Sequence, residues 1–253
     1  MIKIFRTIRQ RMLKENLPDR QAGRFSRYFL YAIGEIVLVV IGILIALQIN
    51  TWNEQRKIKA EEVKLLKNFM TTLQGDTAQF HYYIEEFTTI QNSINILITH
   101  LDEDRPYHNG LPFHFLNSTA VWSPGIDLGV FSTLASTDLN IISNDSLKQS
   151  IVDYYAFANR DFRPLTQKYQ EIIYHASREL FNTRFDQLWN TSGRAMIPHD
   201  YGSLKTDKEY NFFLHSLKNQ LFYLVQDPLR KANDKAGALI RSIDHEVNEL
   251  THR

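Results

Sequence analysis

An apolar stretch of 21 residues, from Phe29 to Ile49, constrains this chain more than any other part of its sequence. A helix of this length spans about 31 Å, which matches the hydrocarbon core of a bilayer. Fourteen of the 21 residues are Ile, Leu, Val or Phe. At about 0.3 to 0.6 kcal/mol each, they outweigh the roughly 2.5 to 3.5 kcal/mol that a central charge such as Glu35 costs. We therefore predict one transmembrane helix over residues 28–52. It is too long for a signal peptide, and no small-x-small cleavage site follows it.

The residues that flank this span predict its orientation. Residues 1–27 carry eight Lys or Arg against two acids, whereas residues 53–68 mix five basic with three acidic residues. The positive-inside rule then places residues 1–27 in the cytoplasm and residues 53–253 in the periplasm of a cell with two membranes. The residues expected at the membrane interfaces are Arg6, Arg9, Arg11, Arg24, Arg27, Tyr28, Tyr31 and Trp52.

The first 16 residues, MIKIFRTIRQRMLKEN, are basic and amphipathic. Met1, Phe5, Ile8 and Met12 share one helical face, a pattern typical of a helix that rests on anionic lipid. A nucleic-acid-binding arm is the alternative for such a basic stretch. Because the segment adjoins a membrane span, we favour the lipid bilayer as its partner and expect no nucleic acid.

A seven-residue apolar repeat follows the span and predicts a long amphipathic helix, or two helices stacked at Gly75. The repeat comprises Leu66, Leu73, Phe80, Phe87, Ile94 and Leu101. The junction between the span and this repeat lacks Pro and Gly, so the membrane helix can continue into it. No stretch alternates long enough to predict a strand. The fold class we expect is all-α, with a periplasmic bundle of about four long helices.

The rest of the chain is divided by loop and capping signals. Residues 102–126 contain Pro and Gly throughout and predict a long loop. A short helix is expected at 128–136, and Asn144 and Asp145 are capping residues for a helix that continues past Pro164 to Leu188. We expect a second loop at 190–204. Thr206 and Glu209 form a capping-box pattern for helices at 207–226 and 228–250, divided at Pro228.

No motif in the sequence predicts catalysis, a cofactor or a metal. The chain has no cysteine, no Gly-x-Ser-x-Gly elbow and no His-Glu-x-x-His pair. Glu249 and His252 have a ligand-like spacing, but they lie at the C-terminal end. The loop residues His100, His108 and His114 match no ligand pattern, and solvated loop polarity is the favoured interpretation. We expect a protein that is not an enzyme.

The aromatic residues are also candidates for recognition. The turn at residues 122–125, Trp-Ser-Pro-Gly, and the pair Tyr154 and Tyr155 could meet a partner. Because most aromatic residues follow helical spacing, core packing is the favoured explanation.

Glu35 shares one helical stripe with small residues. On a helix with 3.6 residues per turn, Gly42 and Ala46 each fall within about 20° of Glu35, and the face comprises Glu35, Leu38, Gly42, Ala46 and Ile49. Close approach of another helix would bury the carboxyl group in protein rather than lipid. We favour this association, with a second copy or another membrane protein. In the alternative, Glu35 reaches toward the headgroups or is neutral.

Two segments resemble a known family. The anchor, YAIGEIVLVVIGILIALQINTWNE, and the middle motif, LNIISNDSLKQSIVDYY, are similar to a family of uncharacterised single-span membrane proteins of Bacteroidota, a domain of unknown function. Thr51 departs from the family pattern, in which a second Asn commonly precedes the Trp. The resemblance implies a bacterial inner-membrane location and implies no activity.

The expected function is that of a membrane-anchored helical interaction or scaffold protein of the cell envelope. It would act as a homo-oligomer or as a subunit of a membrane complex, without catalytic activity. The alternative is a signal-transducing or energy-coupling component, with protons handled by Glu35. The short cytoplasmic segment, which leaves no room for an effector domain, counts against this alternative.

Overall fold

One helix, α2 (Gly23–Asp102), contains both the apolar stretch and the seven-residue repeat. The computed structural model describes residues 23–137, 139–190 and 193–252. The helix lies between Pro18 and Pro106 and passes through Gly75 without a break, so the prediction of a single helix is confirmed. At its end Asp104 adopts a left-handed conformation (φ 52°), and Arg105 N–H donates to the carbonyl of His100 at 2.9 Å. This is a Schellman ending, with Asp where Gly is usual.

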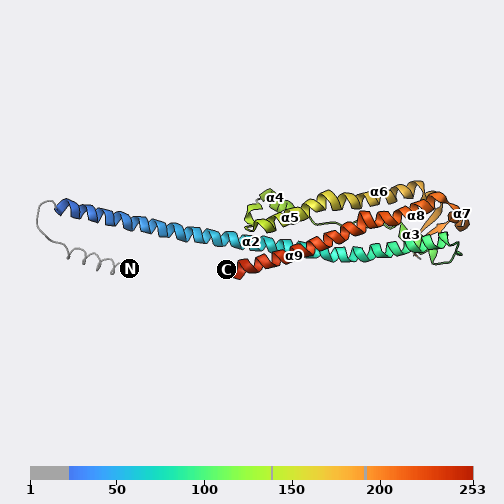
Figure 1. Ribbon diagram of the computed structural model, residues 1–253, viewed down its shortest axis with the longest axis horizontal. Coiled ribbons are helices and arrows are strands. Elements are labelled where there is room, and N and C mark those ends of the chain that lie inside the picture. Colours follow the sequence, from blue (N-terminus) through green and yellow to red (C-terminus); the bar gives the residue numbers. More distant parts are fainter. Residues whose placement is uncertain (1–22, 138, 191–192, 253) are drawn as a thin grey trace. The chain divides into compact units, whose positions relative to one another are not determined.

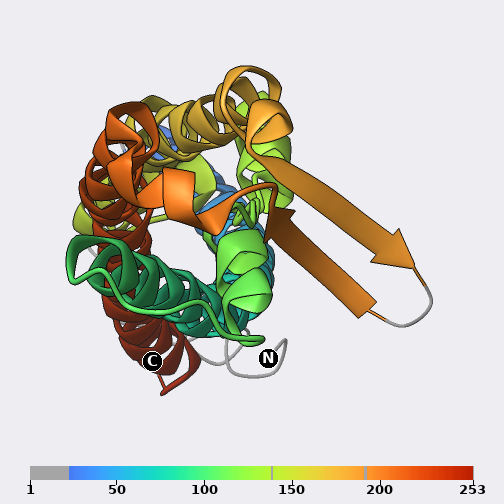
Figure 2. The ribbon, with the colours of Figure 1, turned by 90° about the vertical axis from the view of Figure 1, so that its right-hand side faces the viewer.

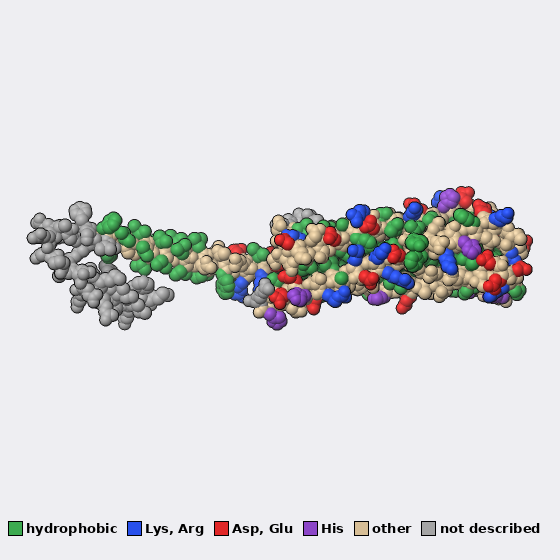
Figure 3. Space-filling view, viewed as in Figure 1, with side chains coloured by type: hydrophobic (Ala, Val, Ile, Leu, Met, Phe, Trp, Pro, Cys, Tyr) green, Lys and Arg blue, Asp and Glu red, His purple; other side chains and the backbone are tan. Residues whose placement is uncertain are grey.

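The chain divides into two units, Met1–Ile58 and Lys59–Arg253. In the first unit, the described part of the apolar stretch makes a helix that is long and apolar enough to cross a membrane. Its large hydrophobic side chains are exposed, and Figure 3 shows them covering the visible surface of this segment. The predicted domain boundaries after residues 27 and 52 are not tested by this division into two units and stay a prediction.

The second unit is a bundle in which three long helical stretches pack side by side (Figure 1). The first is the later part of α2, whose six repeat residues are at most 4% exposed, as predicted. The second joins α5 (Asp145–Phe157) to α6 (Arg163–Glu179), and the third joins α8 (Lys208–Leu221) to α9 (Asp227–His252). The prediction of an all-α fold is confirmed. The described residues hold three long stretches, however, rather than about four.

Two π-helical segments carry helices past prolines, and the second of them explains this difference. Ala158–Phe162 precedes Pro164, and Phe222–Gln226 precedes Pro228. Proline lacks an N–H, and its ring clashes with the carbonyl four residues earlier, so it normally ends or bends a helix. A π-helical turn widens the backbone at that carbonyl and lets the helix continue. The predicted division at Pro228 is therefore wrong, because residues 208–252 are helical throughout.

Short elements occupy what the sequence predicts to be loops. Helix α3 (Leu111–Ser118) lies inside the predicted loop at 102–126, whereas α4 (Gly129–Thr137) matches the short helix expected there. Two 3-10 turns, Leu139–Ile141 and Phe181–Thr183, precede α5 and the hairpin. Helix α7 (Tyr201–Thr206) precedes α8.

A β-hairpin corrects the prediction for residues 185–204. Strand β1 (Phe185–Asn190) pairs antiparallel with β2 (Gly193–Pro198), so neither the helix to Leu188 nor the loop at 190–204 is observed as predicted. Figure 2 shows the hairpin projecting from the bundle, and β2 contacts α3. Phe185 belongs to a second core cluster, together with Phe115 of α3 and Tyr210 of α8.

Candidate functional site

The predicted association face lies entirely on the described part of α2. Leu38 and Ile49 are exposed, and a Cβ added to Gly42 would meet nothing within 4 Å. Glu35 and Ala46 are exposed as well. The helix thus presents these five residues with room for a neighbour. Whether another helix covers them stays a prediction.

The predicted interface residues are placed in part. Tyr28, Tyr31 and Trp52 are exposed on α2, and the Arg56 guanidinium lies 5.0 Å from the centre of the Trp52 ring. The backbone of Arg24 and Arg27 belongs to the same helix. Arg6, Arg9 and Arg11 fall outside the described residues.

A buried carboxylate, Glu62 on α2, holds the middle motif in place. Its side chain is 2% exposed, and its Oε1 accepts hydrogen bonds from Ser143 N–H at 2.7 Å and Ser143 O–H at 2.8 Å. The next residue, Asn144, caps α5 by accepting from Leu147 N–H at 3.1 Å and donates to Glu246 of α9. The predicted cap is confirmed. The Ser-Asn pair also ties the start of α5 to both neighbouring helices.

A second buried carboxylate, Asp76, lies two heptads after Glu62 on the same helix and is 5% exposed. It accepts from Asp127 N–H at 3.1 Å and from the Tyr154 hydroxyl at 3.5 Å. Burial, together with the nearby Asp127 carboxylate, raises the pKa of Asp76 to about 6. Glu62 and Asp76 therefore both anchor the chain around α4 to α2. The sequence signal for these two anchors is the position of two acidic residues on the helical face that carries the buried repeat residues.

The paired tyrosines are core residues. Tyr154 bonds to Asp76, and Tyr155 stacks on Phe131 of α4 with ring centroids 4.4 Å apart. Burial raises the pKa of both hydroxyls above the usual range. Trp122 is half-buried and lies beside Tyr83 at 6.4 Å. The core-packing interpretation therefore holds for Tyr154 and Tyr155, which are both buried.

The histidines at the end of α2 pair with other groups. The rings of His100 and His108 lie 5.0 Å apart, and His114 Nδ1 lies 3.1 Å from the Ser93 hydroxyl. Burial lowers the pKa of His100 and of His114. Within the described ranges, no group of three or more His, Asp or Glu side chains is placed to hold a metal ion.

Arg184 links the base of the hairpin to α8, a contact that the sequence did not predict. Its guanidinium donates to Asp207 at 2.6 Å and to Glu209 at 2.5 Å, which lowers the pKa of Asp207. Asp207 caps α8 by accepting from the N–H groups of Glu209 and Tyr210. The predicted cap at Thr206 is therefore wrong by one residue, since Thr206 ends α7.

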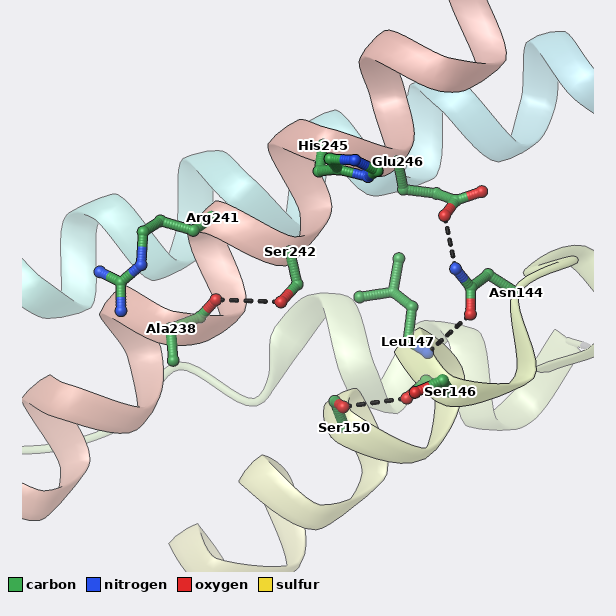
Figure 4. A pocket seen from close by; sticks show the side chains of 9 residues that line it. All are labelled: Asn144, Ser146, Leu147, Ser150, Ala238, Arg241, Ser242, His245 and Glu246. Carbon is green, nitrogen blue, oxygen red and sulfur yellow. Dashed lines mark hydrogen bonds between the residues drawn. The ribbon is translucent and has the colours of Figure 1, made fainter.

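Two grooves run along the bundle. The first, about 510 Å³ between α5 and α9, is lined by small and polar side chains (Figure 4). Its Ser150 and Ser242 hydroxyls donate to the carbonyls of Ser146 and Ala238 within their own helices. The second, about 500 Å³, lies between α6 and α8 and is more apolar. Neither Glu62 nor Asp76 lines either groove.

Comparison with known proteins identifies one family. The model of a family of unknown function, DUF6090, matches residues 35–194, which is more than half of the chain. This range contains Glu35, both buried carboxylates and the whole of the middle motif. No curated protein and no solved structure matches the chain.

Proposed function

The chain belongs to the family of unknown function DUF6090, and from its architecture we propose that it is a membrane-anchored interaction protein. A single span holds it in the membrane, and the bundle docks a partner without catalysing a reaction. The protein acts as a homo-oligomer or as a subunit of a membrane complex, with the Glu35 face as the contact inside the membrane.

The exposed apolar part of α2 is the observation that carries this proposal. Between Phe29 and Ile49, every side chain that the structure describes is exposed, including Ile36, Val39 and Leu44. Soluble monomers rarely expose contiguous apolar surface beyond a few hundred Å². A helix that is apolar on all sides and long enough to cross a bilayer is stable when lipid surrounds it.

The membrane we propose is the inner membrane of a Gram-negative bacterium of the Bacteroidota, with residues 1–27 cytoplasmic and the bundle periplasmic. The basic residues before the span support this orientation. The resemblance of the anchor sequence to membrane proteins of the Bacteroidota supports the proposed group of organisms.

The polar groups of the core support a role without catalysis. Glu62, Asp76 and Asn144 accept hydrogen bonds from backbone N–H groups, and these bonds hold loops and a helix end in place. Gln226, from the second π segment, donates to the carbonyl of Phe87 at 3.2 Å. These groups position the helices, and of the four only Asn144 lines one of the two grooves, where its side chain is engaged in capping α5 and in bonding to Glu246.

Cysteine labelling tests the location and orientation, because the chain has no cysteine of its own. Single-cysteine variants Ser242→Cys in the bundle and Ser26→Cys before the span are treated with a membrane-impermeant maleimide in intact spheroplasts. We expect Ser242→Cys to be labelled, Ser26→Cys to be protected until lysis, and both to resist alkaline carbonate extraction. Extraction by carbonate, or the reverse labelling, would contradict the proposal.

A signal-transducing or proton-coupled role is the second candidate. It is favoured by α2, whose helix is unbroken from Gly23 to Asp102 and contains Glu35. A cellular phenotype that depends on external pH and disappears in Glu35→Gln would support it. A phenotype that persists unchanged in that variant would exclude a role for this carboxyl group.

A further inference from the structure

The groove between α6 and α8 combines an apolar floor with acidic rims. Ile172 of α6 and Phe213 of α8 line it together with Phe212, and its volume is about 500 Å³. Figure 1 shows the two helices running next to each other in the bundle. A groove of this kind, between two helices, is a shape that accepts a third amphipathic helix.

Phe212 is the most unusual side chain of the groove. It is 75% exposed, although the neighbouring buried positions of α8, Tyr210 and Leu214, are at most 1% exposed. Covering an exposed phenylalanine removes apolar surface from water and therefore favours binding. Aromatic residues, Phe among them, are enriched in the buried core of protein interfaces.

The charges along the groove favour a basic partner. Its lining contains Glu171, Glu179 and Glu209 against Lys168. Arg184 engages Glu209, whereas Glu171 and Glu179 form no ion pair with another described residue. These two carboxylates lie eight residues apart on α6, which places them about 12 Å apart along one rim. Basic residues two turns apart on a partner helix would match this spacing.

We propose that this groove binds a basic amphipathic helix of a partner protein, with the apolar face of that helix against Phe212 and its cations along Glu171 and Glu179. The inference rests on the proposed function, since it gives the bundle its docking surface. The basic segment at residues 1–16 of a second copy has similar chemistry, but the predicted topology places it across the membrane.

The test places a fluorescent reporter in the groove. The variant Ser216→Cys, labelled with an environment-sensitive dye, is prepared as the full chain in nanodiscs of zwitterionic lipid; Ser216 lines the groove. The probe is a synthetic Leu/Lys amphipathic peptide of about 18 residues, long enough to be helical when bound. A Leu/Glu peptide of the same pattern is its matched control, and a dye at Ser242→Cys in the other groove is the control position.

We expect saturable binding of the Leu/Lys peptide at Ser216→Cys, and no saturable response at Ser242→Cys or with the Leu/Glu peptide. The added substitution Phe212→Ser should weaken binding by about tenfold or more. Glu171→Gln with Glu179→Gln should weaken it and reduce its dependence on salt. The matched control is Tyr174→Ser. Tyr174 is an aromatic residue on α6 that is 57% exposed and lies outside the groove, so this substitution should not change the affinity for the peptide.

An equal response at both dye positions, equal binding of both peptides, or full binding by Phe212→Ser would overturn the proposal. Such a failure is distinguishable from failure of the proposed function. The carbonate and maleimide experiments report on the anchor alone, and they keep their outcome whether or not the groove binds a peptide.

Discussion

The two parts of α2 use apolar residues in opposite ways. Between Phe29 and Ile49 they surround the helix and are all exposed where described. Between Leu66 and Leu101 the residues of the seven-residue repeat lie on one face and are at most 4% exposed. The backbone is the same helix in both parts. The difference shows that the angular distribution of apolar side chains, more than their number, decides whether a helix needs lipid or neighbouring helices.

Charges in the apolar part should produce the largest effect. The double variant Ile41→Arg/Leu44→Arg adds two central charges, each costing about 2.5 to 3.5 kcal/mol, to a span that already contains Glu35. We expect the protein to be lost from the carbonate-resistant membrane fraction, as measured by immunoblot. The matched control, Thr71→Arg on an exposed position of the bundle, should remain in that fraction. If both variants remain, the apolar stretch is not the anchor.

Truncating a core side chain should have the next largest effect and should act on the bundle alone. Phe80 is fully buried in the main core, and Phe80→Ala should lower the free energy of unfolding by about 3 to 5 kcal/mol. Denaturant titration followed by circular dichroism measures this loss. Ile43→Ala, a truncation in the exposed part of α2, should leave the bundle transition unchanged. An equal loss in both variants would contradict the contrast between the two parts.

Asp76 makes the buried part sensitive to pH. Its pKa rises from 3.8 to about 6 in the folded state, so the folded protein binds the proton more tightly. The resulting contribution to the free energy of unfolding is complete below about pH 4. It is lost as the pH rises to about 6, a change of up to about 3 kcal/mol. The groups that face this carboxyl are Asp127, Tyr154 and Tyr155.

The variant Asp76→Asn removes this titration. Its free energy of unfolding relative to the native chain should therefore increase between pH 4.5 and pH 7, when both are measured by denaturant titration. Glu62→Gln is the comparison. The Glu62 carboxylate accepts two hydrogen bonds from Ser143, and weakening them should lower the free energy of unfolding at pH 7. A constant difference between Asp76→Asn and the native chain across this range would contradict the assignment.

Substitutions of two glycines of α2 should produce the smallest effect. A Cβ added at Gly75 or at Gly42 would meet nothing within 4 Å. Gly75→Ala should raise the free energy of unfolding of the bundle by about 0.5 to 1 kcal/mol, because alanine loses less backbone entropy in a helix. Gly42→Ala should leave that transition unchanged. A loss of stability in Gly75→Ala would show that the helix bends or is contacted there.

Sequence patterns predicted the features that local physics controls. The heptad stripe from Leu66 to Leu101, the cap at Asn144 and the short helix at α4 all follow from periodicity or side-chain hydrogen bonds within a few residues. The cap at Asp207 was missed by one residue because Thr206 and Glu209 also fit a capping box. The acids Glu62 and Asp76 are at stripe positions, but their loop partners, Ser143 and Asp127, are 81 and 51 residues away.

By itself, the sequence determined the helical class, the apolar segment and the face that α2 buries, since these depend on helical period and length. Only the tertiary structure decided that residues 185–198 form a hairpin. Strand β1 has no regular alternation, and it is paired by β2, which packs against α3. The tertiary structure also joined the helices across Pro228 and opened the groove beside Phe212, because the free energy of packing distant segments can outweigh local preference.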